Sequence, residues 1–185
     1  SLSGVWHAAG VLADAMLPKQ DALALARVHA PKAYGGWTLH MACAATGVHA
    51  FALFSSVAAL FGGAGQANYG AANTSLDSLG AFRRARGCPG TSVQWGPWAE
   101  VGMASRGAAN ERMAAMEDAS GFVRIGLAQG LAALSVATRH AAPAVLGVVP
   151  VTWSKIFGES TVVPAFLTAF APKTRKAAAV PDTAS

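Results

Sequence analysis

The chain has 185 residues, of which 53% are hydrophobic and only 12% are charged, with a formal net charge of +5. A composition this apolar can bury a large core, which excludes a wholly disordered chain. The basic residues are scattered and form no stripe interleaved with aromatic residues, which argues against nucleic-acid binding, whereas the net positive charge favours an acidic or phosphate-bearing ligand.

Cysteine content and hydropathy limit the cellular compartments in which we expect this chain. Cys43 and Cys88 fit no metal-ligand spacing and form no disulfide framework, so we expect no metal site and a reducing, cytoplasmic environment. The densest apolar stretch, residues 50–61, is about half as long as the roughly 20 residues that a membrane-spanning helix needs. The first residues carry no basic region and no initiator Met, so we expect no signal peptide and a chain cut from a longer protein.

Short β-capable runs bounded by glycine or proline alternate with segments of helical spacing along the chain. The predicted strands are residues 2–8, 49–55, 91–95 and 144–149. The predicted helical segments are residues 21–43, which Pro31 divides into two helices, and residues 68–86, 111–116 and 122–139. Strands joined by helices of this length pair in parallel, which predicts an α/β fold with a doubly wound parallel sheet.

The predicted helix 68–86 carries a candidate general acid. A phenol with an ordinary pKa of about 10 can donate a proton when a nearby cation stabilises its phenolate. Tyr69 and Asn73 lie four residues apart on one face of this helix. Ser56 follows the second predicted strand, at the type of strand end where open α/β sheets place their active sites. Lys32 lies in the helical segment before that strand.

Each of these residues also has an ordinary structural interpretation. Ser56 is compatible with a helix cap or a turn. Tyr69 is compatible with packing on an alanine-rich helix, and Lys32 with a solvated first helical turn. Only the joint spacing of the set favours chemistry.

Four motifs in register carry a resemblance to a known family. They are His-Ala-Ala-Gly-Val at 7–11, Phe-Ser-Ser-Val-Ala at 54–58, Gly-Gln-Ala-Asn-Tyr-Gly-Ala-Ala-Asn at 65–73 and Trp-Gly-Pro-Trp at 95–98. Together they resemble the ketoreductase domain of modular type I polyketide synthases, a branch of the short-chain dehydrogenase/reductase superfamily. The resemblance spans residues 5–157 and implies a Rossmann-like sheet, with residues 1–170 as a partial ketoreductase domain and residues 171–185 as a linker or tail.

The resemblance implies a role for each candidate residue. Tyr69 would donate the proton to the substrate carbonyl oxygen, and Ser56 would hydrogen-bond the same oxygen. Lys32 would lower the pKa of Tyr69 and contact the nicotinamide ribose, and Asn73 would sustain a proton relay through water. In this family the Lys and Asn positions are exchanged relative to simpler superfamily members, and Lys32 with Asn73 matches the exchanged arrangement.

The resemblance also implies the ligands. The cofactor would be NADPH, and the substrate a β-ketoacyl thioester tethered to an acyl carrier protein, with other synthase domains as partners in the same protein. The residues implied in cofactor binding are His7, Ala8, Ala9, Gly10, Lys32, Tyr69, Gly96, Pro97 and Trp98. For Trp95 and Trp98, aromatic core packing remains an open alternative.

A phosphate-binding turn is not evident in the sequence. A dinucleotide fold has a Gly-rich turn after its first strand, where helix N-terminal amides meet the pyrophosphate. Residues 63–68 mimic the first half of that fingerprint but lack its third glycine and directly precede Tyr69. We therefore expect an N-terminally truncated domain, with the phosphate-binding first strands absent and weak cofactor binding by the isolated fragment.

The stereochemical outcome depends on loops that flank the pocket. Family members that give the D-3-hydroxyl product (B-type) usually carry Leu-Asp-Asp after the His-Ala-Ala-Gly element, and those that give the L-alcohol carry a Trp eight residues before the catalytic Tyr. Here the first motif reads Leu12-Ala13-Asp14, and Phe61 stands at the Trp position. With Met103 in the expected substrate lid, these residues would direct entry of the acyl arm, and we expect the D-alcohol.

The sequence leaves two other functions open. A structural, reductase-like subdomain without activity would share the fold but lose the four candidate catalytic residues, which this chain keeps. A fatty-acid-synthase reductase or a stand-alone short-chain dehydrogenase would keep the chemistry and change the substrate.

Overall fold

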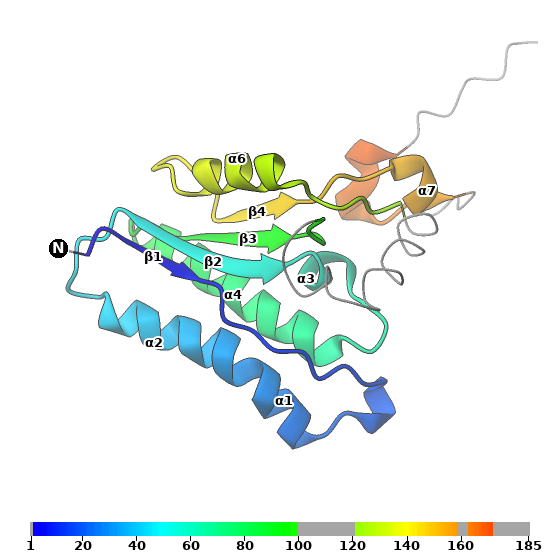
Figure 1. Ribbon diagram of the computed structural model, residues 1–185, viewed down its shortest axis with the longest axis horizontal. Coiled ribbons are helices and arrows are strands. Elements are labelled where there is room, and N and C mark those ends of the chain that lie inside the picture. The colour runs from blue at the N-terminus through cyan, green and yellow to red at the C-terminus, as the bar shows by residue number, and fades with distance from the viewer. Residues whose placement is uncertain (1, 100–120, 159–162, 172–185) are drawn as a thin grey trace, which may run out of the picture.

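The computed structural model describes residues 2–99, 121–158 and 163–171. Its centre is a parallel sheet of four strands, β1 (Gly4–His7), β2 (Ala50–Ser56), β3 (Thr91–Trp95) and β4 (Val145–Val148), whose spatial order follows the sequence (Figure 1). The predicted parallel α/β sheet is therefore confirmed.

The strand register aligns the carboxyl ends of the strands at one edge of the sheet. His7 lies beside Leu53, three positions before Ser56, the last residue of β2. Ser56 lies beside Trp95, and Trp95 lies beside Val148. The segments that follow β1, β2 and β3 therefore start from the same edge, where ligands bind in open α/β sheets.

Helices cover both faces of the sheet. In Figure 1, α1 (Ala22–His29), α2 (Gly35–Ala42) and α4 (Ala67–Ala85) lie below the sheet, and α6 (Leu127–Ala137) lies above it. Shorter helical turns complete the description. They are Leu17–Lys19, α3 (Ala58–Phe61), α7 (Trp153–Phe157) and Ala165–Phe170.

The predicted division at Pro31 takes an unexpected form. Residues Ala30–Tyr34 form a π-helical segment, hereafter the π segment, which joins α1 to α2 without a loop. Pro31 has no amide hydrogen to donate within a regular α-helix, and a wider turn absorbs such an irregularity. The Gly35 amide donates to the Ala30 carbonyl across this wider turn.

Two of the three hydrophobic clusters in the described residues join the helices to the sheet. On the α4 side, Phe51 and Leu53 of β2 pack against Leu76 and Leu79 of α4. On the α6 side, the cluster consists of Val93, Trp95, Ile125 and Ala137, with Phe54, Trp98, Ala133, Leu134, Leu146 and Val148 at its margin. Burial of a side chain of this size contributes about 1.5–3 kcal/mol, so the two clusters account for the sandwich of helices around the sheet.

The α4 side also contains a buried polar junction. The Asp77 carboxylate accepts hydrogen bonds from Ser92 Oγ at 2.6 Å and from Gln94 Nε2 at 2.8 Å. Because Ser92 and Gln94 are buried in the middle of the sheet, Asp77 satisfies polar groups that would otherwise be costly. This junction fixes α4 along β3.

One predicted helix is wrong in its first part. Helix α6 begins at Leu127, and residues 122–126 are extended rather than helical. The Ile125 amide donates to the Pro97 carbonyl at 2.7 Å, and the Val123 amide donates to the Pro150 carbonyl at 3.0 Å. These long-range bonds outweigh the local helical spacing. The predicted helix 111–116 lies outside the described residues.

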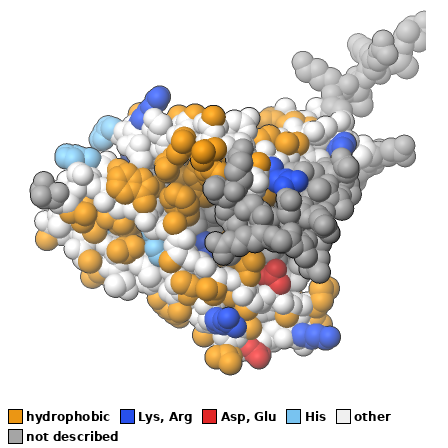
Figure 2. Space-filling model, viewed as in Figure 1, with side chains coloured by type: hydrophobic (Ala, Val, Ile, Leu, Met, Phe, Trp, Pro, Cys, Tyr) orange, Lys and Arg blue, Asp and Glu red, His pale blue; other side chains and the backbone are white. Residues whose placement is uncertain are grey.

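Hydrophobic side chains cover much of the face seen in Figure 2, and charged side chains there are few. Trp6 of the outer strand β1 is half exposed. Within the described ranges, no helix is long and apolar enough to cross a membrane. Both cysteines are free, Cys43 buried and Cys88 exposed.

Candidate active site

Ser56 and Tyr69 stand where β2 gives way to the helices below the sheet. Ser56 is the last residue of β2, and its hydroxyl accepts a hydrogen bond from the Ala58 amide at 3.2 Å, at the start of α3. Tyr69 lies in the first turn of α4 and is buried. The turn interpretation of Ser56 therefore holds as local structure, because the N-cap of α3 is Val57, and the Ser56 hydroxyl can still donate its own hydrogen.

Lys32 reaches the same place from the π segment. Its side chain is buried, and its ammonium donates to the Phe54 carbonyl at 2.9 Å. The ammonium lies 5.3 Å from the centroid of the Tyr69 ring. Gly10 leaves room for this side chain, because a Cβ there would lie 2.9 Å from Lys32 Cε. The predicted cation is thus beside the predicted acid.

The protonation states suit an acid and a cation at neutral pH. Burial lowers the pKa of Lys32 to about 8, and the negative charge of Asp77 limits this shift. Burial raises the pKa of Tyr69; the polar side chains of Asn73 and Ser56 act in the opposite direction, and Asp14 adds to the rise. Near pH 7 the phenol therefore keeps its proton and Lys32 keeps its charge.

Asn73 lies one turn after Tyr69 and is fully buried. Its amide nitrogen donates to the Tyr69 carbonyl at 2.8 Å. Its oxygen Oδ1 is buried and finds no hydrogen-bond partner among the described residues. Buried polar atoms are rarely left unpaired, so this acceptor fits a bound water or ligand group.

Asn68 was missed as a candidate from the sequence. Its Oδ1 accepts from the Tyr69 amide at 2.8 Å, and its Nδ2 donates to the Ala13 carbonyl at 2.8 Å. It therefore ties the first turn of α4 to the segment that follows β1. The only signal in the sequence is an Asn at a helix start, which caps helices in many proteins without any catalytic role.

The segment after β1 shows two environments. Ala8 and Ala9 are exposed at the sheet edge, and Gly10 is half-buried beside Lys32. The His7 side chain is buried, with its Nε2 at 3.1 Å from the Lys32 carbonyl oxygen. Ala8 and Ala9 are thus accessible to a ligand, whereas the His7 imidazole faces the π segment.

The residues that follow β3 also lie in two different environments. Gly96 crosses close to the end of β4, where a Cβ would lie 2.7 Å from Val149 Cγ2, and Pro97 is half-buried. The Trp98 ring packs on Trp95 with centroids 5.0 Å apart, and a Cβ at Gly130 of α6 would overlap it. The Trp98 side chain is therefore part of the packing on the α6 side.

The residues expected to guide the substrate lie around the start of α4. Leu12 is partly exposed, and the Asp14 carboxylate accepts from Gln66 Nε2 at 3.1 Å. The Phe61 ring meets Phe122 edge-on with centroids 5.0 Å apart. Met103 lies outside the described residues.

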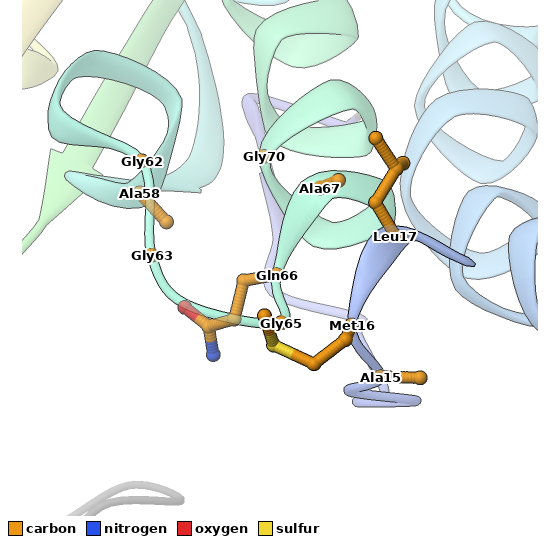
Figure 3. A pocket seen from close by; sticks show the side chains of 10 residues that line it. All are labelled: Ala15, Met16, Leu17, Ala58, Gly62, Gly63, Gly65, Gln66, Ala67 and Gly70. Carbon is orange, nitrogen blue, oxygen red and sulfur yellow. The ribbon is translucent and has the colours of Figure 1, made fainter. Parts of the chain in front are cut away.

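A pocket of about 420 Å³ opens beside these residues. Residues 62–66 run along one side of it and residues 15–17 along the other (Figure 3). It also contacts Ala58, Ala67 and Gly70, but neither Ser56 nor Tyr69 lines it. The pocket therefore lies against the first turn of α4, which carries Tyr69, but neither Tyr69 nor Ser56 forms part of its wall.

No group of three or more His, Cys, Asp or Glu side chains in the described part of the chain could hold a metal ion.

Comparison with known proteins gives one consistent family. The sequence-family model described as the KR domain matches residues 1–100 of this chain. A curated relative, a phenolphthiocerol/phthiocerol polyketide synthase of Mycobacterium tuberculosis, is 50% identical over 103 residues, which is 56% of this chain and 5% of that protein.

Solved structures agree. An A-type ketoreductase from a modular polyketide synthase superposes with a TM-score of 0.76 at 32% identity, covering 84% of this chain and 32% of that chain. A C2-type ketoreductase from a modular polyketide synthase gives 0.74 at 35% identity, covering 91% and 35%. The chain thus spans about a third of the solved ketoreductases that it matches. It belongs to the ketoreductase domain family of polyketide synthases, within the short-chain dehydrogenase/reductase superfamily.

Proposed function

We propose that this chain carries the catalytic residues of an NADPH-dependent ketoreductase that reduces a carrier-tethered β-ketoacyl thioester to the β-hydroxyacyl product. The observation that carries the proposal is the buried Lys32 ammonium 5.3 Å from the Tyr69 ring, at the sheet edge where Ser56 ends β2. A buried ammonium beside a buried phenol is costly to maintain without a use for it.

The residues divide the work as the chemistry requires. Reduction of a ketone builds negative charge on the carbonyl oxygen, and donors already in position stabilise that charge. The Ser56 hydroxyl donates to this oxygen, and Tyr69 donates to it and delivers its proton. Lys32 then stabilises the phenolate that remains, and Asn73 Oδ1 holds a water through which the phenol regains its proton.

The described residues fit the nicotinamide end of such a cofactor. Ala8 and Ala9 are exposed at the sheet edge, and Gly10 has no side chain to obstruct a group approaching Lys32. When bound, the cofactor supplies the hydride to the carbonyl carbon. The ammonium of Lys32 would hold the ribose, and the backbone of residues 8–10, with Gly96 and Pro97, would line the rest of this end.

For the substrate we propose entry past the segment that contains Leu12 and Asp14, with the D-alcohol as product. Asp14 is bonded to Gln66, three residues before Tyr69, so this segment is fixed relative to the acid. The side from which the acyl arm enters decides which face of the ketone meets the hydride. A carrier-protein domain and further synthase domains are the partners that this function requires.

An assay of substrate preference tests the proposal. The full-length protein is supplied with NADPH and with a β-ketoacyl group as its carrier-protein thioester, as a pantetheine thioester or as a free ketone. We expect reduction of both thioesters, faster from the carrier. Preference for the free ketone would favour a stand-alone dehydrogenase, and no reduction by a protein that binds the carrier would favour a structural subdomain.

A further inference from the structure

The His7 side chain makes a hydrogen bond inside the protein, to the backbone of Lys32. It is the last residue of β1 and is only 6% exposed, with Nε2 at 3.1 Å from the Lys32 carbonyl oxygen. A carbonyl can only accept, so Nε2 carries the hydrogen of this bond. The His7 side chain thereby connects the C-terminal end of β1 to the π segment.

Gly35, the first residue of α2 after the π segment, leaves room for this ring. A Cβ at Gly35 would lie 3.2 Å from His7 Cε1, which is tighter than most real contacts. The absence of a side chain at Gly35 therefore lets the helix backbone approach the imidazole closely. The Lys32 carbonyl also accepts from the Gly35 amide, so the His7 bond adds a second donor at the widened turn. Such π turns occur often at functional sites.

The side chain of Lys32 is also held, at its ammonium end. The Lys32 ammonium donates to the Phe54 carbonyl of β2, and its side chain passes close to Gly10. The backbone of Lys32 is thus fixed to β1 and its ammonium to β2. A displacement of the π segment would carry the ammonium away from the Tyr69 ring.

We propose that His7 is a positioning residue, which donates to the Lys32 carbonyl and thereby holds the π segment so that the Lys32 ammonium stands over Tyr69. This inference rests on the proposed function, because it assigns Lys32 a catalytic task. The ionisable groups that face Lys32 are Tyr69 and Asp77 on α4 and His7 itself on β1.

The test compares two substitutions of His7 in the full-length protein. His7→Phe keeps the ring volume and removes the donor, whereas His7→Gln places an amide nitrogen close to the position of Nε2. His49→Gln is the matched control, because His49 is exposed at the opposite end of the sheet, before β2. The measurements are kcat and its pH dependence, KM for the thioester, NADPH affinity, and hydrogen exchange of residues 30–36.

We expect His7→Phe to speed exchange in residues 30–36 but not in α4, and to lower kcat by about ten- to a hundredfold with little change in KM. The alkaline limb of its pH profile should move upward as Lys32 gains access to water. His7→Gln should restore most of the exchange protection and of kcat, and His49→Gln should match the wild type.

Three results would overturn the inference. Unchanged exchange in residues 30–36 would show that the bond does not hold the π segment. Equal loss of NADPH affinity in both His7 variants would make His7 a cofactor contact. A lower melting temperature with unchanged kcat would make it merely structural. If Lys32→Ala retains wild-type kcat, the proposed function fails instead, and the exchange result still decides whether His7 holds the turn.

Discussion

Helices α4 and α6 cover opposite faces of one sheet, yet they differ in what they bury. Besides apolar residues, helix α4 buries four residues with polar side-chain groups, Asn68, Tyr69, Asn73 and Arg83, whereas α6 buries only Gly130 and Ala137. Asn68 and Arg83 donate to the Ala13 and Pro89 carbonyls, whereas Asn73 Oδ1 has no partner among the described residues. Helix α6 instead offers small residues that let Trp98 pack against it.

Under the proposed function, α4 carries residues that take part in the reaction, whereas α6 serves as structural support. Burying a polar group costs free energy unless the group has a hydrogen-bond partner. We therefore expect the buried polar groups of one helix either to bond within the protein or to bind a ligand. The aromatic residues near β3 lie at the same sheet edge but on the α6 side, where packing accounts for the contacts of their rings. The following substitutions test this division.

Tyr69→Phe in the full-length protein should have the largest effect. It removes the hydroxyl that donates a proton as charge develops on the substrate oxygen, so kcat should fall by about 10²–10⁴-fold. NADPH affinity, measured by cofactor fluorescence, should stay largely intact because the ring remains. The control is Tyr34→Phe, on an exposed tyrosine of the π segment. Turnover close to wild type would remove Tyr69 from the mechanism.

Lys32→Ala should change the pH dependence of the reaction. In the wild type we expect kcat for reduction to fall as pH rises through about 8, because Lys32 loses its charge there while burial keeps Tyr69 protonated. Without the ammonium, kcat near pH 7 should drop by about 10²-fold, and the remaining alkaline limb should lie higher. An unchanged profile would make Lys32 an ordinary helix residue.

Gly130→Ala should affect stability and leave chemistry alone. The new Cβ would overlap the Trp98 ring, and overpacking of this kind costs about 1–3 kcal/mol, partly offset by about 1 kcal/mol of helix propensity. Chemical denaturation measures the change, and the matched control is Gly47→Ala, where nothing lies within 4 Å of the added atom. A loss of kcat at unchanged stability would place Trp98 among the catalytic groups.

Asp14→Ala should have the smallest effect, on stereochemistry. It removes the exposed hydrogen bond to Gln66, which contributes about 0.5–1.5 kcal/mol, so the excess of D- over L-alcohol should shrink by about tenfold at most. Chiral chromatography of the reduced thioester gives the ratio. A wild-type product that is mainly the L-alcohol would contradict the expected D configuration without touching the reductase assignment.

The sequence predicted the sheet well because its strands are short apolar runs between glycine or proline breakers. It failed at residues 122–126, where apolar spacing compatible with a helix is satisfied by an extended segment bonded to Pro97 and Pro150. Pro31 indicated an interruption of the first helical segment. The π turn that forms there is also held by long-range bonds to neighbouring strands, from His7 of β1 and to Phe54 of β2. No local pattern reports that.

For the site, local spacing placed Tyr69 and Asn73 on one helix, Ser56 at the end of a strand and Lys32 in the helical segment before that strand. The family resemblance then implied their roles. The bonds that hold the site were not predictable. Lys32 binds the Phe54 carbonyl, and His7 reaches the Lys32 carbonyl across 25 residues of sequence. Backbone acceptors of this kind leave no trace in residue identity. Asn68 was therefore found only in the three-dimensional structure, and so was the bond from His7, which the resemblance had implied in cofactor binding.

The most direct test of the central claim follows the hydride itself. The full-length protein is given a β-ketoacyl carrier thioester and NADPH carrying two deuterium atoms at C4 of the nicotinamide, and the product is examined by mass spectrometry. The proposed function predicts one deuterium at the β-carbon of the product in the wild type, and almost no labelled product from Tyr69→Phe. Failure of the folded, NADPH-binding wild type to transfer deuterium, or equal transfer by Tyr69→Phe, would contradict it.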